Sequence, residues 1–131
     1  MSNLGRQWQQ LDMYKTAKEL RSMRLGDVES AKIWDVGRTP AHELEKSVMD
    51  QKLVESRQSG LYDSIKAQGV SKPVYISTVR PSAYKESAFT SVIKDVNPAY
   101  KPPSGNIVMD GHHRIAAAHD INPNMLLPVD Y

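Results

Sequence analysis

One stretch of the sequence sets the architecture of the chain: NIVMDGHHRIAAA, residues 106–118. Its first part, Asn106–Asp110, is a short apolar run that predicts a strand, and a helix is predicted over about His113–Asp120. A tight turn at Gly111 joins the two. A strand that feeds a helix in this way directs unpaired backbone N–H groups at one point, where the helix dipole attracts anions. The stretch therefore predicts an anion-binding turn.

The first turn of this helix carries charges of the unusual sign. Acidic side chains are favoured there, yet the sequence places His112, His113 and Arg114 in it, and each cation costs about 0.3 kcal/mol or more against the helix dipole. That cost disappears when an anion lies among them. Arg114 can hold a phosphate through two parallel hydrogen bonds, and either histidine can donate a hydrogen bond or carry a proton. We therefore predict a phosphate or nucleotide site at Gly111, His112, His113 and Arg114, with Asp110, His112 and His113 as candidate catalytic residues.

Other interpretations of these residues stay open. Arg114 could form an ion pair with Asp110, and the histidines could be surface residues or helix caps. A metal bound by Asp110 and one of the adjacent histidines would need His42 as a further ligand. His119 cannot join His112 on one ion, because seven helical residues span about 10.5 Å. The interpretation that we prefer assigns no metal ligands.

The composition limits the kind of protein. The chain has 131 residues, of which 40% are hydrophobic and 24% charged, and this predicts a globular protein with a modest core. It has no cysteine, which excludes disulfides and cysteine catalysis. It has neither an apolar run of membrane-spanning length nor a secretion signal at its start, so we expect a cytoplasmic protein without a membrane partner. Its net charge of +2 is low for a domain that holds DNA by charge alone.

Local patterns predict the remaining elements. Gln7–Arg24 has apolar residues at steps of three and four, which indicates an amphipathic helix. Asp27–Val36 fits a short strand or a helical turn, with Ile33, Trp34 and Val36 turned inward. Later signals predict a helix from Thr39–Pro40 to about Val54, a helix over Ser59–Gln68, a strand over Pro73–Val79, a long loop over Arg80–Gly105 with a helical turn near Phe89–Lys94, and a last strand over Leu126–Tyr131.

These elements predict an α/β fold of the α+β type. We expect a small mixed sheet with packed helices, preceded by N-terminal helices. The aromatic side chains of Trp8, Trp34 and Tyr62 are expected in the core. The basic residues of the first helix favour a solvated face, with DNA binding through Lys18 and Arg21 as the alternative.

Three blocks of the sequence resemble the ParB/sulfiredoxin-like superfamily. Residues 60–76 resemble the helix, Gly-Val turn and Pro-initiated strand of the ParB N-terminal-like nuclease domain. Met109–Ala118 resembles the ParB segment Gly-Glu-Arg-Arg with its small-residue helix, and Leu127–Val129 resembles the final strand. The resemblance covers about residues 55–131 without the long loop, and it is nearest to stand-alone domains of this type, phage-encoded ones included. It leaves residues 1–54 as an N-terminal helical extension.

The resemblance implies a function at the same turn. It implies a nucleotide- or nucleic-acid-binding domain with weak NTPase or nuclease activity, and a nucleotide with Mg²⁺ as cofactor. His112 and His113 replace the Glu and the first Arg of the ParB motif, and sulfiredoxin chemistry is excluded because His112 stands in place of the cysteine. Free-serine kinases of this superfamily carry a similar Asp-Gly-His segment. In that alternative Asp110 is a functional carboxylate and Glu55 is a candidate for the second. In a further alternative the chain is a non-enzymatic interaction or regulatory protein, such as a phage accessory protein, that binds a protein partner through its N-terminal helices.

Overall fold

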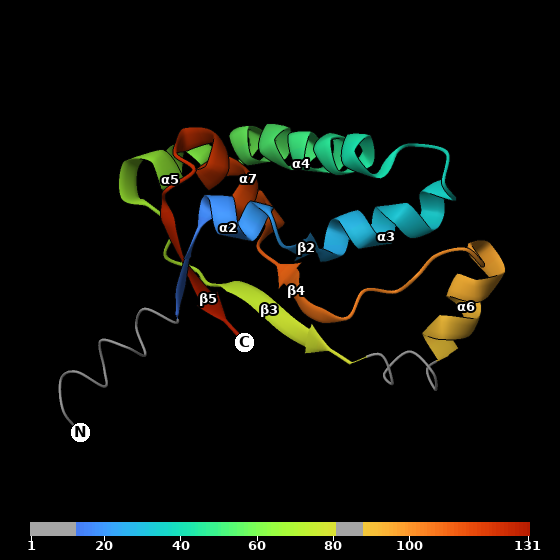
Figure 1. Ribbon diagram of the computed structural model, residues 1–131. Coiled ribbons are helices and arrows are strands. Elements are labelled where there is room, and N and C mark those ends of the chain that lie inside the picture. Colours follow the sequence, from blue (N-terminus) through green and yellow to red (C-terminus); the bar gives the residue numbers. More distant parts are fainter. Residues whose placement is uncertain (1–12, 81–87) are drawn as a thin grey trace, which may run out of the picture.

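A computed structural model describes residues 13–80 and 88–131 of the chain (Figure 1). It has an α+β fold, as the sequence predicts. The elements in chain order are β1 (Tyr14–Thr16), α2 (Ala17–Arg21), β2 (Arg24–Leu25), α3 (Gly26–Asp35), α4 (Ala41–Gln58), α5 (Leu61–Gln68), β3 (Val74–Val79), α6 (Ala88–Val96), β4 (Gly105–Asp110), α7 (His112–Ile121) and β5 (Leu126–Asp130).

The strands form one mixed sheet in the order β1-β5-β3-β4-β2. β1 pairs antiparallel with β5, and β3 antiparallel with β4, whereas β5 runs parallel to β3 and β2 parallel to β4. Because β2 and β4 are parallel neighbours, they end at the same edge of the sheet. Each continues directly into a helix, β2 into α3 and β4 into α7. The topology therefore brings the starts of two helices together.

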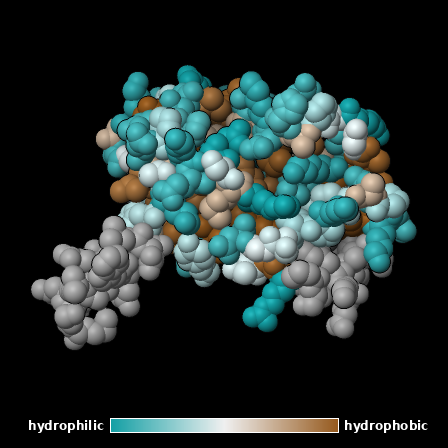
Figure 2. All heavy atoms as spheres, viewed as in Figure 1, coloured by the Kyte–Doolittle hydropathy of each residue, from teal (hydrophilic) through white to brown (hydrophobic). Residues whose placement is uncertain are grey.

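The core lies between the sheet and the helices α4, α5 and α7, which Figure 1 shows together on one side of the strands. The central helix, α7, buries Ile115 and the run Ala116–Ala118. The small alanines let α7 approach its neighbours closely, as dense packing requires. On the face shown in Figure 2, hydrophilic residues cover most of the helical side. Among the described helices, none combines the length and apolar composition of a membrane span.

The first part of the chain differs from the predicted helix over Gln7–Arg24. Its described residues form β1, α2 and β2 instead. Tyr14–Thr16 pairs with the last strand, and Thr16 then caps α2 in a reciprocal capping box with Glu19. The three- and four-residue spacing of apolar residues is thus overridden by long-range strand pairing. The extension predicted for residues 1–54 contributes both edge strands, and the boundary predicted at residue 54 falls within α4.

The ambiguous segment Asp27–Val36 is helical and forms most of α3. Ile33 is buried as expected, but the predictions for Trp34 and Val36 are wrong, because these side chains are 61% and 43% exposed. The buried face of α3 is formed by Val28, Glu29 and Ile33, and Trp34 lies outside it. Tyr62 is half-buried, and Trp8 lies outside the described residues.

The predicted elements from α4 onward are confirmed with small shifts of their ends. α4 begins at Ala41 with Pro40 as the cap and extends to Gln58, beyond the predicted end at Val54. The long loop holds more structure than expected, because α6 covers Ala88–Val96. The predicted turn at Gly111 joins β4 to α7 in the left-handed conformation.

Candidate functional site

The predicted anion-binding turn lies at the start of α7. Gly111 has a φ of 103°, and a Cβ atom there would lie 3.0 Å from Val74 Cγ2, so both conformation and space require glycine. Its N–H donates a hydrogen bond to Oδ1 of Asp110, 2.9 Å away. Gly111, the N-cap of α7, has no side chain that could accept from the N–H groups that follow it. The next backbone N–H groups are therefore in the position from which helices bind anions.

A second helix start lies against this one. α3 begins at Gly26, where a Cβ atom would lie 2.8 Å from the carbonyl oxygen of Val108, so glycine lets α3 begin directly against β4. The backbone N–H of Asp27, in the first turn of α3, donates a hydrogen bond to Nε2 of His112, 3.2 Å away. The positive ends of two helix dipoles thus converge on one place.

His112 is the link between the two helix starts. Its side chain is buried, and its Nδ1 lies 3.4 Å from Oδ2 of Asp27. Burial lowers the pKa of His112, and this effect outweighs the attraction of the Asp27 carboxylate. The imidazole is therefore neutral at pH 7, with Nε2 as an acceptor and the proton on Nδ1. Both ring nitrogens face Asp27, so the geometry gives His112 the role of positioning the starts of α3 and α7 relative to each other. The predicted catalytic role of His112 stays a prediction.

Lys52 of α4 adds a cation at the same place. Its Nζ lies 2.8 Å from Oδ2 of Asp27. Burial raises the pKa of Asp27, but the hydrogen bond from Lys52 and the neighbouring His112 outweigh it and hold that pKa below its usual value. Asp27 is therefore a carboxylate at neutral pH. Lys52 uses one of its three donors on Asp27, which leaves donors for a ligand.

His113 points from α7 toward α4. Its Nε2 lies 3.2 Å from Oε1 of Glu55, and both side chains are partly exposed. Glu55, the second carboxylate named from the sequence, thus lies beside the predicted site. A carboxylate that contacts an exposed imidazole is an arrangement that can accept a proton from a substrate.

Arg114 points toward β3. Its Nη2 donates a hydrogen bond to the carbonyl oxygen of Pro73, 2.8 Å away, whereas its Nε is buried and is without a hydrogen-bond partner among the described residues. The alternative ion pair with Asp110 is not formed, because Asp110 accepts from Gly111 and Arg114 donates to Pro73. The side chains of His112, His113 and Arg114 therefore point from the first turn of α7 toward α3, α4 and β3 respectively.

The sequence did not reveal Asp27 and Lys52. Asp27 follows Gly26 in the first turn of a helix, as His112 follows Gly111, and this similarity was the one available signal. Lys52 had none, because a lysine on an amphipathic helix is normally solvated. The structure joins these residues to the predicted site through β2–β4 pairing and the contact of α3 with α4.

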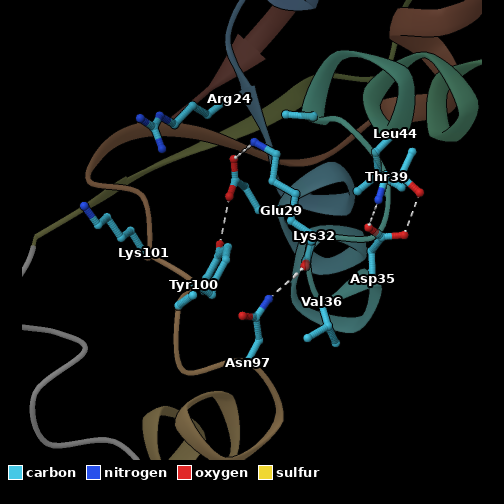
Figure 3. A pocket seen from close by; sticks show the side chains of 13 residues that line it. Arg24, Glu29, Lys32, Asp35, Val36, Thr39, Leu44, Asn97, Tyr100 and Lys101 are labelled. Atoms are coloured by element: carbon cyan, nitrogen blue, oxygen red, sulfur yellow. Dashed lines mark hydrogen bonds and ion pairs between the residues drawn. The ribbon is translucent and has the colours of Figure 1, made fainter.

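A cavity of about 500 Å³ lies elsewhere, between the end of α3 and the segment 97–101 (Figure 3). Buried Glu29 accepts hydrogen bonds from Lys32 and from the hydroxyl of Tyr100, 3.0 and 2.8 Å away. The amide of Asn97 donates to two carbonyl oxygens near the end of α3. These polar groups form hydrogen bonds with one another and hold the segment 97–101 against α3. The cavity therefore lies at a structural contact between this segment and α3.

Within residues 13–80 and 88–131, no group of three or more potential His or carboxylate ligands is placed to hold a metal ion. His42, the further ligand considered from the sequence, lies exposed in the first turn of α4. In a comparison with protein-family models, curated proteins and solved structures, no match to this chain was found.

Proposed function

We propose that this chain binds the phosphate group of a nucleotide or another small phosphorylated molecule at the start of α7, as a ParB/sulfiredoxin-like domain would. The observation that carries the proposal is the convergence of two helix starts, α3 and α7, beside the ammonium group of Lys52. The N–H groups that follow Gly111 at the start of α7 and the positive ends of two helix dipoles all favour an anion at this point. Arg114, with a buried Nε that has no partner among the described residues, can reorient to supply further donors.

A small ligand fits this site better than a nucleic acid. The carboxylates of Asp27, Glu55 and Asp110 surround the helix starts. They would repel the extended row of phosphates of DNA or RNA, whose binding requires a continuous cationic surface. A single phosphate group can contact the N–H groups and Lys52 without lying along all three carboxylates.

The contact between Glu55 and His113 favours a second function, phosphoryl transfer to a small alcohol, as in free-serine kinases. In that reaction Glu55 accepts the proton of the acceptor hydroxyl. The hydroxyl oxygen forms a bond to the phosphorus of the donor nucleotide. The bond from phosphorus to the leaving oxygen breaks, and the electron pair leaves with that oxygen. A Mg²⁺ ion would be held chiefly by the nucleotide's own phosphate oxygens.

Binding is tested by thermal shift with phosphate, pyrophosphate, ADP, ATP, CTP, GTP and duplex DNA, each with and without Mg²⁺. A ligand at a hundred times its Kd stabilises the folded state by about 2.7 kcal/mol. We expect a shift with pyrophosphate or a nucleotide that is reduced in Lys52→Gln and in Arg114→Ala. Lys46→Gln is the matched control, because Lys46 lies on the same helix and also pairs with an aspartate, Asp50. The proposal fails if no phosphate compound shifts the melting temperature. Such a result would leave the interaction-protein alternative.

Transfer is separated from binding by Glu55→Gln, which keeps the shape of the side chain and removes its basicity. We expect this variant to bind the nucleotide at least as tightly as the wild type and to transfer phosphate to serine about 10²–10⁴-fold more slowly, the usual contribution of a general base. Release of the nucleotide product in the presence of serine and related alcohols measures the rate. An unchanged rate in Glu55→Gln would exclude Glu55 as the base.

A further inference from the structure

A groove between α3 and α4 continues from the candidate site. Its volume is about 590 Å³. Asp27, Lys52 and Glu55 line it and also take part in the contacts at the helix starts. The groove is further lined by Ser30, Ala31, Trp34, Ser47, Val48 and Gln51. A ligand bound by its phosphate at the start of α7 therefore has an open space beside it.

Trp34 lies at a distance from the charged part of this groove. It follows Asp27 by seven residues on α3, which corresponds to about 10.5 Å along the helix. Residues at this spacing share one helix face, and both line the groove. The Trp34 side chain is 61% exposed, although large aromatic side chains normally bury most of their surface. The groove is thus lined by a cationic group, that of Lys52, and by an exposed aromatic ring, that of Trp34.

We infer that Trp34 is a stacking platform for the planar base of a nucleotide whose phosphates lie at the start of α7. This inference rests on the proposed function, and it names the part of the ligand that the groove recognises. A nucleotide has an anionic end and a planar end, separated by a sugar. The groove offers Lys52 to the anionic end and Trp34 to the planar end. The polar side chains of Ser30, Ser47 and Gln51 can form hydrogen bonds to a sugar or a base edge.

The chemistry of the groove favours a nucleotide over an apolar partner helix. An apolar helix in this groove would remove the ion pair of Asp27 and Lys52 from water, and the desolvation of such a pair is costly. A nucleotide lets Lys52 contact the phosphate and leaves Asp27 in contact with water. Trp34 lies on α3, outside residues 55–131 that carry the family resemblance, so the platform belongs to the part of this chain that the resemblance does not cover.

The experiment uses the tryptophans of the full chain as reporters. The sequence has two tryptophans, Trp8 and Trp34, so Trp8→Phe leaves Trp34 as the sole source of tryptophan fluorescence. We expect ADP and CDP to change the emission of Trp34 and pyrophosphate to leave it nearly unchanged. By calorimetry, Trp34→Ala should weaken ADP binding about 5- to 150-fold, which corresponds to about 1–3 kcal/mol of stacking. It should leave pyrophosphate binding unchanged, and Trp34→Phe should recover part of the loss.

The outcomes separate this inference from the proposed function. Equal binding of ADP by wild type and Trp34→Ala, with no change in Trp34 emission, would overturn the platform and leave phosphate binding intact. Absence of binding by both pyrophosphate and ADP would overturn both. Trp34→Ala is expected to fold, because the side chain is largely solvent-exposed, and circular dichroism checks this.

Discussion

The backbone N–H of Asp27 donates a hydrogen bond to Nε2 of His112, 3.2 Å away, and thereby joins the starts of α3 and α7. The two residues are 85 positions apart in the sequence. The bond exists because parallel pairing of β2 with β4 places both helix starts at one edge of the sheet. It turns a histidine of the predicted phosphate motif toward a neighbouring helix and makes its protonation state part of the stability of the fold.

The burial of His112 predicts a loss of stability in mild acid. Its pKa is lowered in the folded protein and close to 6.5 in the unfolded chain. Below 6.5 the unfolded chain therefore binds more protons, and the free energy of unfolding decreases as the pH falls toward the lowered pKa. Above 6.5 His112 contributes no pH dependence. Urea denaturation between pH 7.5 and 5 measures this change, and the range lies above the pKa of Asp27.

His112→Gln is the comparison for the pH profile. It should remove the part of the decrease between pH 6.5 and 5 that is due to His112, whatever its effect on stability at pH 7.5. Should the variant be too unstable to measure, an NMR titration of wild-type His112 should give a pKa below 6.5. Parallel pH profiles of wild type and variant, or an imidazole that titrates at 6.5 or above, would show that His112 is not held neutral.

Gly111→Ala should destabilise the protein more than Gly60→Ala. Both glycines cap a helix start with positive φ, 103° and 83°, so both changes impose about 1–2 kcal/mol of backbone strain. At Gly60 the described part of the chain places no atom within 4 Å of the new Cβ, the adjacent residues and the backbone of its own helix aside, whereas at Gly111 the Cβ meets Val74 at 3.0 Å. Crowding at Gly111 adds about 1–3 kcal/mol. Chemical denaturation of the two variants checks the difference, and equal losses would show that α7 does not start tightly against β3.

Tyr100→Phe should weaken the contact between the segment 97–101 and α3 that Figure 3 shows. The Tyr100 hydroxyl donates to the carboxylate of Glu29, which is only 8% exposed, so its removal leaves a buried oxygen with one partner fewer. We expect a loss of about 1–3 kcal/mol in the free energy of unfolding. Tyr75→Phe is the matched control; Tyr75 is exposed, and the expected change is within about 0.5 kcal/mol. Equal effects of the two changes would show that the hydroxyl of Tyr100 does not hold the segment.

Val36→Asn should stabilise the protein. Val36 ends α3 with a φ of 55°, in the left-handed region, which is unfavourable for a β-branched side chain and better tolerated by asparagine. We expect a gain of about 0.5–1 kcal/mol in the free energy of unfolding. Val54→Asn, an exposed valine within α4, should change it little, because the two residues have similar helix propensities. A loss of stability in Val36→Asn would contradict this account of the helix end.

The elements from α4 to β5 were predictable because local signals mark their ends. Proline and glycine punctuate the chain at Pro40, Gly69 and Gly111, and the runs between them have clear periodicity. β1 and β2 were not predictable, because strands of three and two residues leave almost no periodic signal. They form by pairing with β5 and β4, which are distant in the sequence.

The candidate site likewise contains residues that local patterns identify and residues that long-range packing brings together. The turn Asp110–Arg114 was named from the sequence, because charge at a helix start is a local feature. Glu55 was named only through the resemblance to free-serine kinases. The approach of Asp27 and Lys52 depends on how α3 and α4 pack, and no local pattern encodes it. Trp34 was expected in the core, yet the buried face of α3 is formed by Val28, Glu29 and Ile33, which all precede it.

The central claim, that a phosphate binds at the start of α7, is tested most directly by backbone amide chemical shifts. We expect pyrophosphate, titrated into the ¹⁵N-labelled protein, to shift the amides of Gly111, His112, His113 and Arg114 most, together with that of Asp27. The shifts should saturate, and Lys52→Gln should weaken them while Lys46→Gln does not. Unchanged amides at the start of α7, or shifts confined to the cations Arg24 and Lys101 in the lining of the cavity in Figure 3, would contradict the claim.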